Sequence, residues 1–477
     1  MTDDCDVLIA GGGPTGVTLG ILLAQQGLSV LIAEKEAGIY PLPRAAHLDH
    51  EVMRILQAAG VADAVASTCR TTKRYDFLTA DRQVLLRFEG SDRIGPGGWP
   101  GANMIHQPSV EQELHARLAQ LPTARLEGSH ELQSFSQDAN GVSAVLAGPD
   151  GEREVRAKYL VGADGARSPV RHGCDIAFED LGFEEPWLVV DVLVDDYAKL
   201  PDANLQICDP ARPTTCVLMG AGRHRWEFMI LPGESPEVVS SDASVAALLE
   251  PWDVADAVRL ERKAVYTFRA RIAKTWRNGR VLLAGDAAHQ TPPFAGQGMG
   301  SGLRDAMNLA WKLAAVIGGA SDLLLDSYQT ERGPNLRATI DMAVMMGRTV
   351  CITDPAAAAM RDRQMLAVRA AGQSPDGNVA YPPIAEGAVL AGSAGAGSYF
   401  PQPVAGGLRL DALLEAGHWL LTRGDLERAD LAPFKAALAG WFDANGVDAV
   451  LVRPDRYVFG TGDPKILAEE WHKLTLI

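Results

Sequence analysis

Several features that mark other classes of protein are scarce in this 477-residue sequence. Basic residues are in the minority: 44 Lys and Arg stand against 60 Asp and Glu, and the formal net charge is −16. Nucleic acids and anionic membranes attract surfaces rich in Lys and Arg, so neither is an expected partner. No run approaches the roughly 18 consecutive apolar residues of a membrane span, and the acidic start MTDDCD does not resemble a signal peptide. We therefore expect a cytoplasmic protein.

Cysteine is also scarce, with six residues spread along the chain. They form no Cys-x-x-Cys pair and no metal-ligand spacing, which argues against a disulfide scaffold and gives no reason to expect a metal site. The chain is longer than one ordinary domain, so two or three domains are expected.

The most informative pattern near the start is DVLIAGGGPTGVTLGILLAQQGLSVLIAEKE, residues 6–36. An apolar strand at 7–10 runs into a G-x-G-x-x-G turn, a helical segment follows, and a second strand at 29–33 ends at Glu34. In such a turn Gly11 permits the tight bend, Gly13 lets a pyrophosphate approach the backbone, and Gly16 lets helix and strand pack closely. The helix N-terminus then faces the phosphates.

An acid at the end of the second strand refines this prediction. Glu34 is placed to accept hydrogen bonds from an adenosine ribose, and a carboxylate suits a free 2′-hydroxyl, which favours FAD or NAD over NADP. Thr15 and Lys35 flank these positions and are further candidate contacts. A glycine-rich turn without a ligand is the structural alternative.

Two later segments have the same order of strand, acidic turn and helix: KYLVGADGARSPVR (158–171) and RVLLAGDAAHQTPPFAGQGM (280–299). They place Asp164 and Asp286 at strand ends. Carboxylates suit the hydroxyl donors of a ribityl chain. Helix N-termini suit a pyrophosphate and the electron-rich edge of a reduced flavin ring. The alternative for Asp286 is a simple helix N-cap.

In this order and spacing, the three motifs resemble those of the single-component (class A) FAD-dependent aromatic hydroxylases. The resemblance is strongest to the branch with 3-(3-hydroxyphenyl)propionate hydroxylase and the polyketide hydroxylases, through TPPFAGQGMGSGLRDAMNLAWKLA and RWEFMILPGE, and it covers about residues 5–345. It implies a monooxygenase in which NADH or NADPH reduces FAD and O₂ adds to give a flavin hydroperoxide. Oxygen then passes to a phenolic or other electron-rich aromatic ring.

The resemblance also implies roles for individual residues. Glu34 would bind the adenosine ribose, Asp286 the ribityl chain, and Asp164 would lie near the pyrophosphate and the nicotinamide path. Arg44 and Gln107 would reach the phosphate and ribityl region, and Pro293 would lie over the flavin ring. The residues expected to offer backbone N–H groups to the pyrimidine edge are Gly296, Gln297, Gly298 and Met299. No His or Cys context suggests a covalent flavin, so FAD is expected to bind non-covalently and the nicotinamide cofactor transiently.

The residue that handles the substrate proton is less defined. A phenol titrates near ~10 and its anion donates electrons better, so a base or a positive charge is expected in the pocket. His47 is the first candidate, with helix entry as its alternative role, and His106 and His224 follow. Arg225 would lie near the flavin or merely on a polar strand face. The absence of a paired Arg cluster favours a neutral phenol over a benzoate.

The expected fold class is α/β (α+β overall), with a Rossmann-type FAD-binding domain, a mixed-sheet substrate domain and a C-terminal thioredoxin-like domain. We expect the FAD-binding domain at 1–75, 100–180 and 275–350, the substrate domain at 76–99 and 181–274, a connector at 351–404 and the C-terminal domain at 405–477. No Cys follows Cys351, so that last domain lacks a dithiol. A monomer or homodimer is expected. An oxidase or dehydrogenase without oxygen insertion, and a non-catalytic flavin-binding protein, are the alternative functions.

Overall fold

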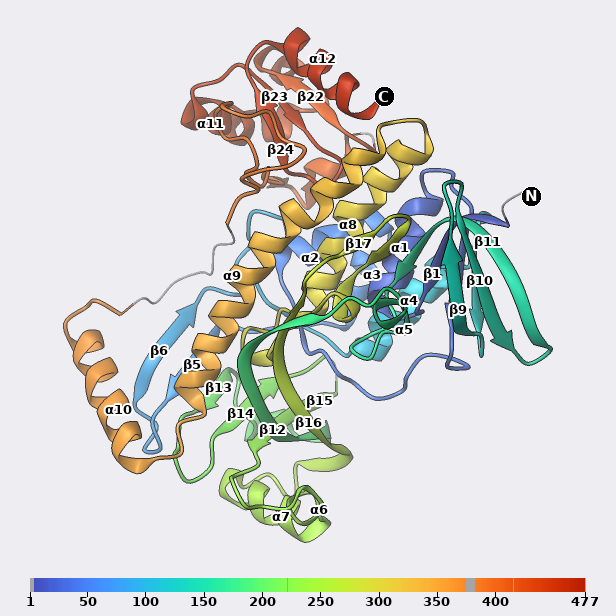
Figure 1. The fold of residues 1–477 in the computed structure, drawn as a ribbon. Helices are drawn as coiled ribbons and strands as arrows, with labels where there is room; N and C mark the ends of the chain where they lie inside the picture. The colour runs from blue at the N-terminus through green and yellow to red at the C-terminus, as the bar shows by residue number, and fades with distance from the viewer. Residues whose placement is uncertain (1–3, 221, 375–381, 415, 477) are drawn as a thin grey trace.

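A computed structural model gives the structure of residues 4–220, 222–374, 382–414 and 416–476, and two eight-stranded sheets organise most of it (Figure 1). The first sheet has a parallel centre with an antiparallel hairpin at one side. β1 is buried almost throughout, as expected for a parallel strand covered on both faces. In order, the sheet contains β17 (Arg277–Asn278), β18 (Val281–Leu283), β11 (Gly151–Gly162), β1 (Cys5–Ala10), β2 (Val30–Glu34) and β8 (Ala124–Gly128), with β10 (Val142–Gly148) and β9 (Glu131–Gln137) extending from β11.

This parallel arrangement decides where the three sequence motifs meet. β1, β11 and β18 are neighbours in the sheet and run in the same direction. Their carboxyl ends therefore lie along one edge, and the loops that follow them come together there. Helices α1 (Pro14–Ala24) and α8 (Gly298–Ile317), which start after the first and third of these loops, pack against each other.

The second sheet is mixed. β13 pairs in parallel with β5, and all the other strand pairs of this sheet are antiparallel. It confirms the predicted strand pair at 75–88 and the predicted antiparallel strands between 187 and 231. The turn predicted at 220–222 includes residue 221, which lies outside the described residues. In order, the strands are β19 (His289–Gln290), β16 (Val258–Ala273), β12 (Phe178–Val194), β15 (Arg223–Met229), β14 (Thr214–Leu218), β13 (Asn204–Ile207), β5 (Arg74–Leu78) and β6 (Val84–Glu89).

Side chains along β15 alternate between the two faces of this sheet. Trp226 and Phe228 are buried in an apolar cluster with Leu188 and Val190 of β12. The intervening positions, Arg225 and Glu227, therefore point to the opposite face, as strand geometry requires. That face carries the polar part of the candidate site.

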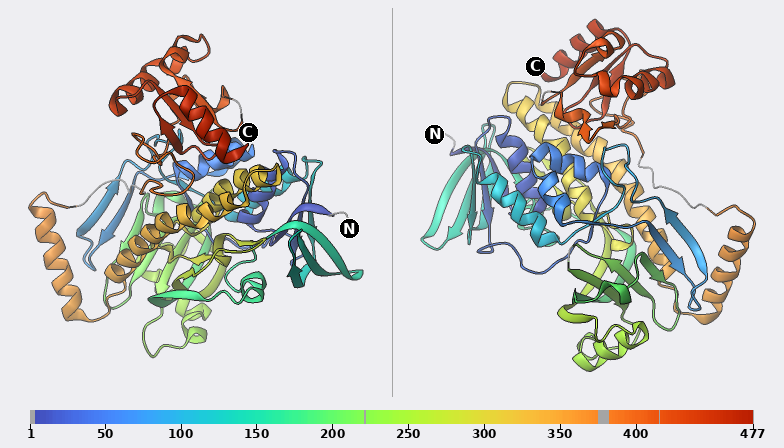
Figure 2. Two further views of the ribbon diagram at one scale, coloured as in Figure 1. Left: turned by 45° about the horizontal axis from the view of Figure 1, so that its top comes forward. Right: turned by 180° about the vertical axis from the view of Figure 1, so that it is seen from behind.

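A long helix and a C-terminal unit complete the fold. α9 (Ser327–Val350) runs from the C-terminal unit past α8 to the second sheet (Figures 1 and 2). α10 (Pro355–Ala370) lies against β6. The C-terminal unit has an antiparallel three-stranded sheet with its own apolar core, and its likeness to thioredoxin stays a prediction. Its elements are β22 (Trp419–Thr422), α11 (Lys435–Asn445), β23 (Ala449–Val452), β24 (Val458–Thr461) and α12 (Pro464–Thr475), of which α12 was not expected from the sequence.

The remaining helices and strands are short connecting elements. They are β3 (His47–Leu48), α2 (His50–Ala59), α3 (Ala62–Thr68), β4 (Arg70–Thr71), β7 (Asn103–Met104), α4 (Gln107–Leu118), α5 (Pro169–Gly173), α6 (Pro236–Val239), α7 (Asp242–Leu249), β20 (Val404–Ala405) and β21 (Leu408–Arg409).

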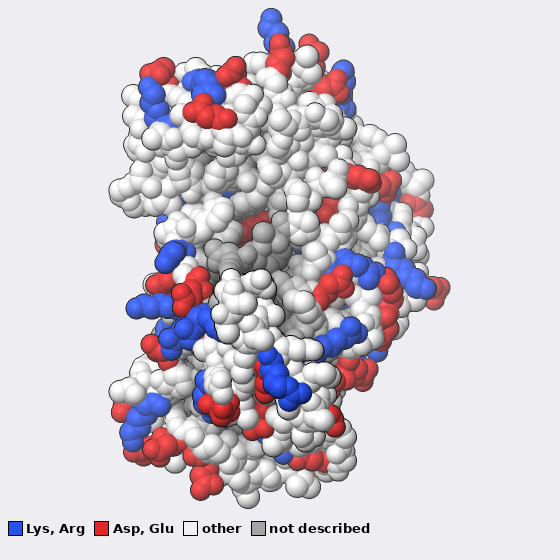
Figure 3. Space-filling view, turned by 90° about the vertical axis from the view of Figure 1, so that its left-hand side faces the viewer, with Lys and Arg blue, Asp and Glu red and all other residues white. Residues whose placement is uncertain are grey.

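The described residues show surface properties that bear on partners. On the face in Figure 3, acidic and basic side chains of the described residues are interspersed, without a broad basic area of the kind nucleic acid requires. Among the described residues, no helix combines the length and the hydrophobicity of a membrane crossing.

Candidate active site

A cavity of about 1060 Å³ opens where the loops after β1, β11 and β18 meet the second sheet. Gly13, Gly165 and Asp286 line it from the three loops, and Tyr75 and Arg225 line it from the second sheet. Pockets for one small ligand usually measure ~300–1,000 Å³. The volume therefore allows a ring system such as a flavin and a small aromatic molecule to lie side by side.

The first glycine turn has the space that a pyrophosphate needs. A Cβ atom added to Gly13 would meet no atom within 4 Å. In contrast, a Cβ on Gly11 would lie 2.3 Å from the carbonyl oxygen of Ala163, and one on Gly16 would lie 2.1 Å from that of Gly11. Gly11 and Gly16 thus permit close packing, while Gly13 leaves open the side that faces the cavity, which fits a bound dinucleotide.

The acidic end of β2 is held against this turn. Glu34 Oε2 accepts a hydrogen bond from the Gly12 N–H at 2.6 Å, and Oε1 accepts one from the Glu36 N–H at 2.9 Å. Each carboxylate oxygen keeps further acceptor capacity for ribose hydroxyls. Lys35, next in the chain, is exposed. Neither Glu34 nor Lys35 lines the cavity, so an adenosine bound here would lie outside it.

Two helices, α1 and α8, direct their N-termini at the cavity. Their N-cap residues, Gly13 for α1 and Gln297 for α8, supply no side-chain cap, so the first N–H groups are left for a ligand. Gly296 adopts a left-handed conformation, φ +64°, at the turn before α8. Residues 293–299 of this turn, including Pro293, Gly298 and Met299, all line the cavity.

The two predicted aspartates differ in their surroundings. Asp286 is exposed to the cavity itself, and because protein surrounds it on the other sides, burial raises the pKa of its carboxyl group. Asp164 accepts a hydrogen bond from the Val170 N–H in the first turn of α5 at 3.0 Å, and Ser168 is the N-cap of that helix. The Oδ1 atom of Asp164 is buried and has no hydrogen-bond partner among the described residues, and burial also raises the pKa of Asp164. Only Asp286 lines the cavity directly, while Asp164 lies behind Ala163 and Gly165.

The segment around Arg44 is braced from two sides. Gln107 Oε1 accepts a hydrogen bond from the Ala45 N–H at 2.7 Å. Arg225 donates to the carbonyl oxygens of Arg44 and Pro43, at 2.7 and 3.0 Å. The guanidinium of Arg44 is left to line the cavity, 5.2 Å from the centre of the Tyr40 ring.

The charge of Arg225 is already balanced. Its Nε atom donates to Asp191 Oδ1 at 2.6 Å, and Arg262 NH1 lies 3.3 Å from Asp191 Oδ2. Asp191 was not singled out in the sequence. Because Asp191 pairs with Arg225 inside the protein, Arg225 mainly holds the backbone of residues 43–44 and is not a free cation.

The candidate histidines separate clearly in the structure. His47 lines the cavity, its Nδ1 atom lies 3.3 Å from the carbonyl oxygen of Gly296, and burial lowers its pKa. His106 immediately precedes α4, and His224 lies against Cys216 at 3.1 Å in the second sheet. Neither His106 nor His224 lines the cavity.

A row of polar side chains crosses the second sheet beneath the cavity, and sequence reasoning did not single it out. Thr215 Oγ1 donates to Gln206 Oε1 at 2.7 Å, Gln206 Nε2 donates to the Tyr75 hydroxyl at 2.6 Å, and that hydroxyl donates to the Phe294 carbonyl at 2.9 Å. Glu227 lies beside Thr215 on the neighbouring strand. The sequence did contain one signal for Glu227. The alternation in RWEFM places Glu227 on the same face of the strand as Arg225.

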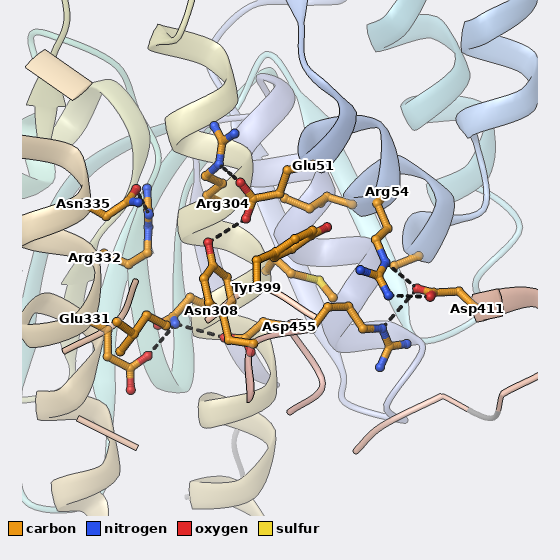
Figure 4. Close-up of a pocket in the computed structure, with 16 residues that line it drawn as sticks. Glu51, Arg54, Arg304, Asn308, Glu331, Arg332, Asn335, Tyr399, Asp411 and Asp455 are labelled. Atoms are coloured by element: carbon orange, nitrogen blue, oxygen red, sulfur yellow. Dashed lines mark hydrogen bonds and ion pairs between the residues drawn. The ribbon is translucent and has the colours of Figure 1, made fainter. Parts of the chain in front are cut away.

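A second and much smaller cavity, about 20 Å³, lies between α2, α8, α9 and the C-terminal region (Figure 4). It has room for about one water molecule. Glu51 accepts hydrogen bonds from Arg304 Nε at 2.6 Å and from the Tyr457 hydroxyl at 2.7 Å. Arg304 also donates to Gln297 Oε1 at 3.1 Å, so these contacts connect the C-terminal unit to the turn before α8.

Comparison with known proteins agrees with this geometry. Residues 4–343 match a family described as an FAD binding domain, and residues 422–476 match one described as the HcaD C-terminal domain. A probable NADH-specific resorcinol 4-hydroxylase of Rhodococcus jostii (strain RHA1) is 38% identical, over 95% of this chain and 91% of that protein.

Two further relatives differ in how much of their length is matched. A 3-(3-hydroxy-phenyl)propionate/3-hydroxycinnamic acid hydroxylase of Comamonas testosteroni is 42% identical, over 77% of this chain and 62% of that protein. The crystal structure of aklavinone-11 hydroxylase with FAD and aklavinone is 27% identical, covers 100% of both chains and superimposes with a TM-score of 0.81.

Proposed function

Because this chain belongs to the family of FAD-dependent aromatic hydroxylases, we propose that it hydroxylates a small phenol with O₂ and NADH or NADPH. The net reaction consumes the phenol, O₂, NAD(P)H and a proton, and yields the hydroxylated phenol, water and NAD(P)⁺. The observation that carries the proposal is one cavity that joins an open glycine turn to a pocket on the second sheet, where Tyr75, Gln206, Thr215 and Glu227 line it. FAD, when bound, supplies electron transfer and oxygen activation, and the chain supplies binding, orientation and exclusion of water.

The residues that would hold FAD follow from the geometry. Gly13 and the N-terminus of α1 would face the pyrophosphate, and Glu34 the adenosine ribose. Asp286, open to the cavity, would accept hydrogen bonds from the ribityl hydroxyls. The backbone of 296–299 at the start of α8 would face the pyrimidine edge, with Pro293 against the ring.

The substrate we propose is a small and uncharged phenol. Asp191 already neutralises Arg225, and the adjacent polar groups of the second sheet, Tyr75, Gln206 and Thr215, are neutral. Among the described residues of the second sheet, Arg225 is the cation that lines the cavity, and it is already paired, so a substrate carboxylate would find no free cation on that side; Arg44 and Arg93 line other parts of the cavity. NADH is the proposed reductant, because the name of the Rhodococcus jostii relative describes that protein as specific for NADH.

We retain the predicted domain division as part of this proposal. Strands of the first sheet come from residues 5–34, 124–162 and 277–283, and most of those of the second from 74–89 and 178–273, which supports it; β19 (289–290) of the second sheet falls in a segment predicted for the FAD-binding domain. A cytoplasmic location, a monomer or homodimer, and catalytic roles for His47, Arg225 and Pro293 stay predictions.

Phenol-stimulated oxidation of NAD(P)H tests the proposed function. The FAD-loaded protein is incubated with resorcinol, other phenols and matched benzoates under ¹⁸O₂, and NAD(P)H consumption and label in the product are measured. We expect neutral phenols to stimulate consumption and to incorporate one labelled oxygen atom. Oxidation of the aromatic compound without label would instead identify an oxidase or dehydrogenase, and the absence of stimulation by every phenol would favour a non-catalytic flavin protein.

Arg44→Ala is expected to slow flavin reduction more than it weakens FAD binding. The guanidinium lines the cavity near the turn where the flavin would lie, whereas the backbone of residues 43–45 is held by Arg225 and Gln107. Loss of one charged contact to a substrate usually costs about 1.5–3 kcal/mol, or roughly 10- to 100-fold in rate. Anaerobic stopped-flow reduction by NADH, compared with FAD affinity measured by fluorescence, separates the two effects. An unchanged reduction rate would contradict this role.

A further inference from the structure

We propose that Glu227 receives the proton of the substrate's phenolic hydroxyl group while the aromatic ring is hydroxylated. This inference rests on the proposed function and assigns a catalytic residue to it. Glu227 lies on β15 at the floor of the large cavity, in the part formed by the second sheet.

The position of Glu227 leaves its carboxylate available to a ligand. The residue is only 6% exposed, yet it lines the cavity. No hydrogen bond between described residues ends on its carboxylate, and its nearest cation is Arg225, whose NH1 atom lies 3.6 Å from Oε1. A buried carboxylate needs hydrogen-bond donors, and a phenolic hydroxyl in the cavity would supply one.

The neighbouring residues place this carboxylate beside the reacting region. Thr215 is the cross-strand partner of Glu227, and the row of hydrogen bonds through Gln206 and Tyr75 leads from there to the Phe294 carbonyl. Phe294 follows Pro293 in the turn that would contact the flavin ring. A substrate ring between this turn and β15 would therefore have the flavin on one side and Glu227 within reach of its hydroxyl.

Other groups in the same region are less suited to accept the proton. The Tyr75 hydroxyl already donates its proton to Phe294. Arg225 is paired with Asp191. His47 also lines the cavity and contacts the Gly296 carbonyl in the turn before α8, and it is the rival that the experiment must test.

The charged and titratable groups that face Glu227 are Arg225 on its own strand, Asp191 on β12 and Tyr75 on β5. Burial raises the pKa of Glu227 to about 7, with Asp191 raising it further and Arg225 opposing both. A base is most effective when its pKa lies near the working pH. Above about pH 7 the carboxylate is ionised and able to accept a proton.

The proposed step balances with the reactants of the net reaction, O₂ and NAD(P)H. The O–H bond of the substrate breaks, its proton goes to the Glu227 carboxylate, and its electron pair moves into the ring as the ring carbon bonds to one O₂-derived oxygen atom, while the bond between the two O₂-derived atoms breaks. The same ring carbon then releases its hydrogen as a proton to the second oxygen atom, which leaves as water with one hydrogen supplied by the reduction. The ring becomes aromatic again, and Glu227 returns its proton to the phenolic oxygen.

Glu227→Gln tests the proposal, because it keeps the shape and removes the base. We expect kcat/KM for a neutral phenol to fall by about 10²-fold or more, since general base catalysis contributes ~10²–10⁴-fold. FAD content and the anaerobic rate of flavin reduction should stay close to wild type, so that NADH is oxidised while more of the oxygen leaves as peroxide. Glu184→Gln, which removes an exposed carboxylate paired with Arg269, is the matched control and should leave all of these values unchanged.

Two readouts separate a proton acceptor from a structural role. The hydroxylation rate of the wild type should decline as pH falls through about 7, and Glu227→Gln should lose this step. Fluorinated phenols, which ionise more readily, should recover part of the activity of the variant.

Three outcomes would overturn the proposal. The first is an unchanged pH profile and coupling in Glu227→Gln. The second is a loss of activity that accompanies loss of FAD and that acidic phenols do not recover. The third is that His47→Ala, and not Glu227→Gln, releases more peroxide and recovers activity with fluorinated phenols. If wild-type protein hydroxylates no phenol at all, the proposed function has failed and the inference fails with it, a result that is distinct from an active wild type with an equally active Glu227→Gln.

Discussion

Purified Gly13→Ala protein is expected to be folded but colourless. In the structure, Gly13 has φ −75° and ψ −178°, which alanine adopts without strain, and an added Cβ would meet no atom within 4 Å. The free protein should therefore tolerate the methyl group. The same space is where the pyrophosphate must approach the backbone, so the methyl group would collide with bound FAD. Overpacking of ~1–3 kcal/mol predicts FAD binding that is weaker by about 5- to 150-fold.

Two glycine variants control this experiment. Gly440→Ala, in the exposed part of α11, also places its Cβ in open space and should retain FAD fully. Gly16→Ala should lose both stability and FAD, because its Cβ would lie 2.1 Å from a backbone oxygen. Thermal unfolding of the FAD-free proteins and titration with FAD distinguish the three cases. A Gly13→Ala protein that binds FAD as tightly as wild type would show that the pyrophosphate lies elsewhere.

Glu331→Gln is expected to destabilise the protein by about 3–5 kcal/mol, the usual cost of breaking a buried ion pair. Glu331 is 2% exposed, and its Oε2 atom lies 2.8 Å from Lys312 Nζ and 2.6 Å from Arg453 NH2. These residues join α8 and α9 to the strand end after β23, next to the cavity in Figure 4. Without the carboxylate, Asp455, which pairs with Arg453, would be the one carboxylate left for these two buried cations among the described residues.

Denaturant unfolding, together with limited proteolysis of the C-terminal unit, measures this effect. Glu427→Gln, which removes an exposed partner of Lys435, should change stability by less than about 1 kcal/mol. Combining Glu331→Gln with Lys312→Met should recover part of the loss, because one unpaired cation is then removed. Equal midpoints for Glu331→Gln and Glu427→Gln would contradict the prediction.

The pH dependence of stability gives an independent check. Burial alone would raise the pKa of Glu331, but Arg453 and Lys312 outweigh burial and lower it to about 2. A lowered pKa in the folded state means that this stabilisation is fully present above the ordinary Glu value near ~4.3 and is lost as pH falls towards 2. The acid-induced decline in stability between these values should therefore be smaller in Glu331→Gln.

The cofactor half of the site could be predicted from local sequence because its determinants are local. Gly11, Gly13 and Gly16 act through the backbone conformation and the space at one turn, and Glu34 acts from the end of the next strand. Parallel neighbours place their carboxyl ends at one edge of a sheet, so the acidic turns after β11 and β18 also had to lie near this point. The flavin contacts expected of the turn at 293–299 came from the family resemblance, and they stay predictions.

The substrate half depended on tertiary contacts. Strand alternation showed that Arg225 and Glu227 share a face, but not that Asp191 of β12 would neutralise Arg225, because the two lie 34 residues apart. Likewise, nothing local indicated that His224 would be buried against Cys216 or that Tyr75, Gln206 and Thr215 would form one row. Which strands become neighbours decides these pairings, and long-range packing sets that order.

The sequence by itself therefore determined the dinucleotide turn and the family, because backbone geometry and residue spacing over short distances encode the motifs that carry them, while the individual cofactor contacts stay predictions. Only the tertiary structure decided which charges remain free in the cavity and how the C-terminal unit is attached. Both depend on side chains from distant segments, such as Glu331 with Arg453 or Glu51 with Tyr457, whose charges and hydrogen bonds are satisfied only after the chain has folded.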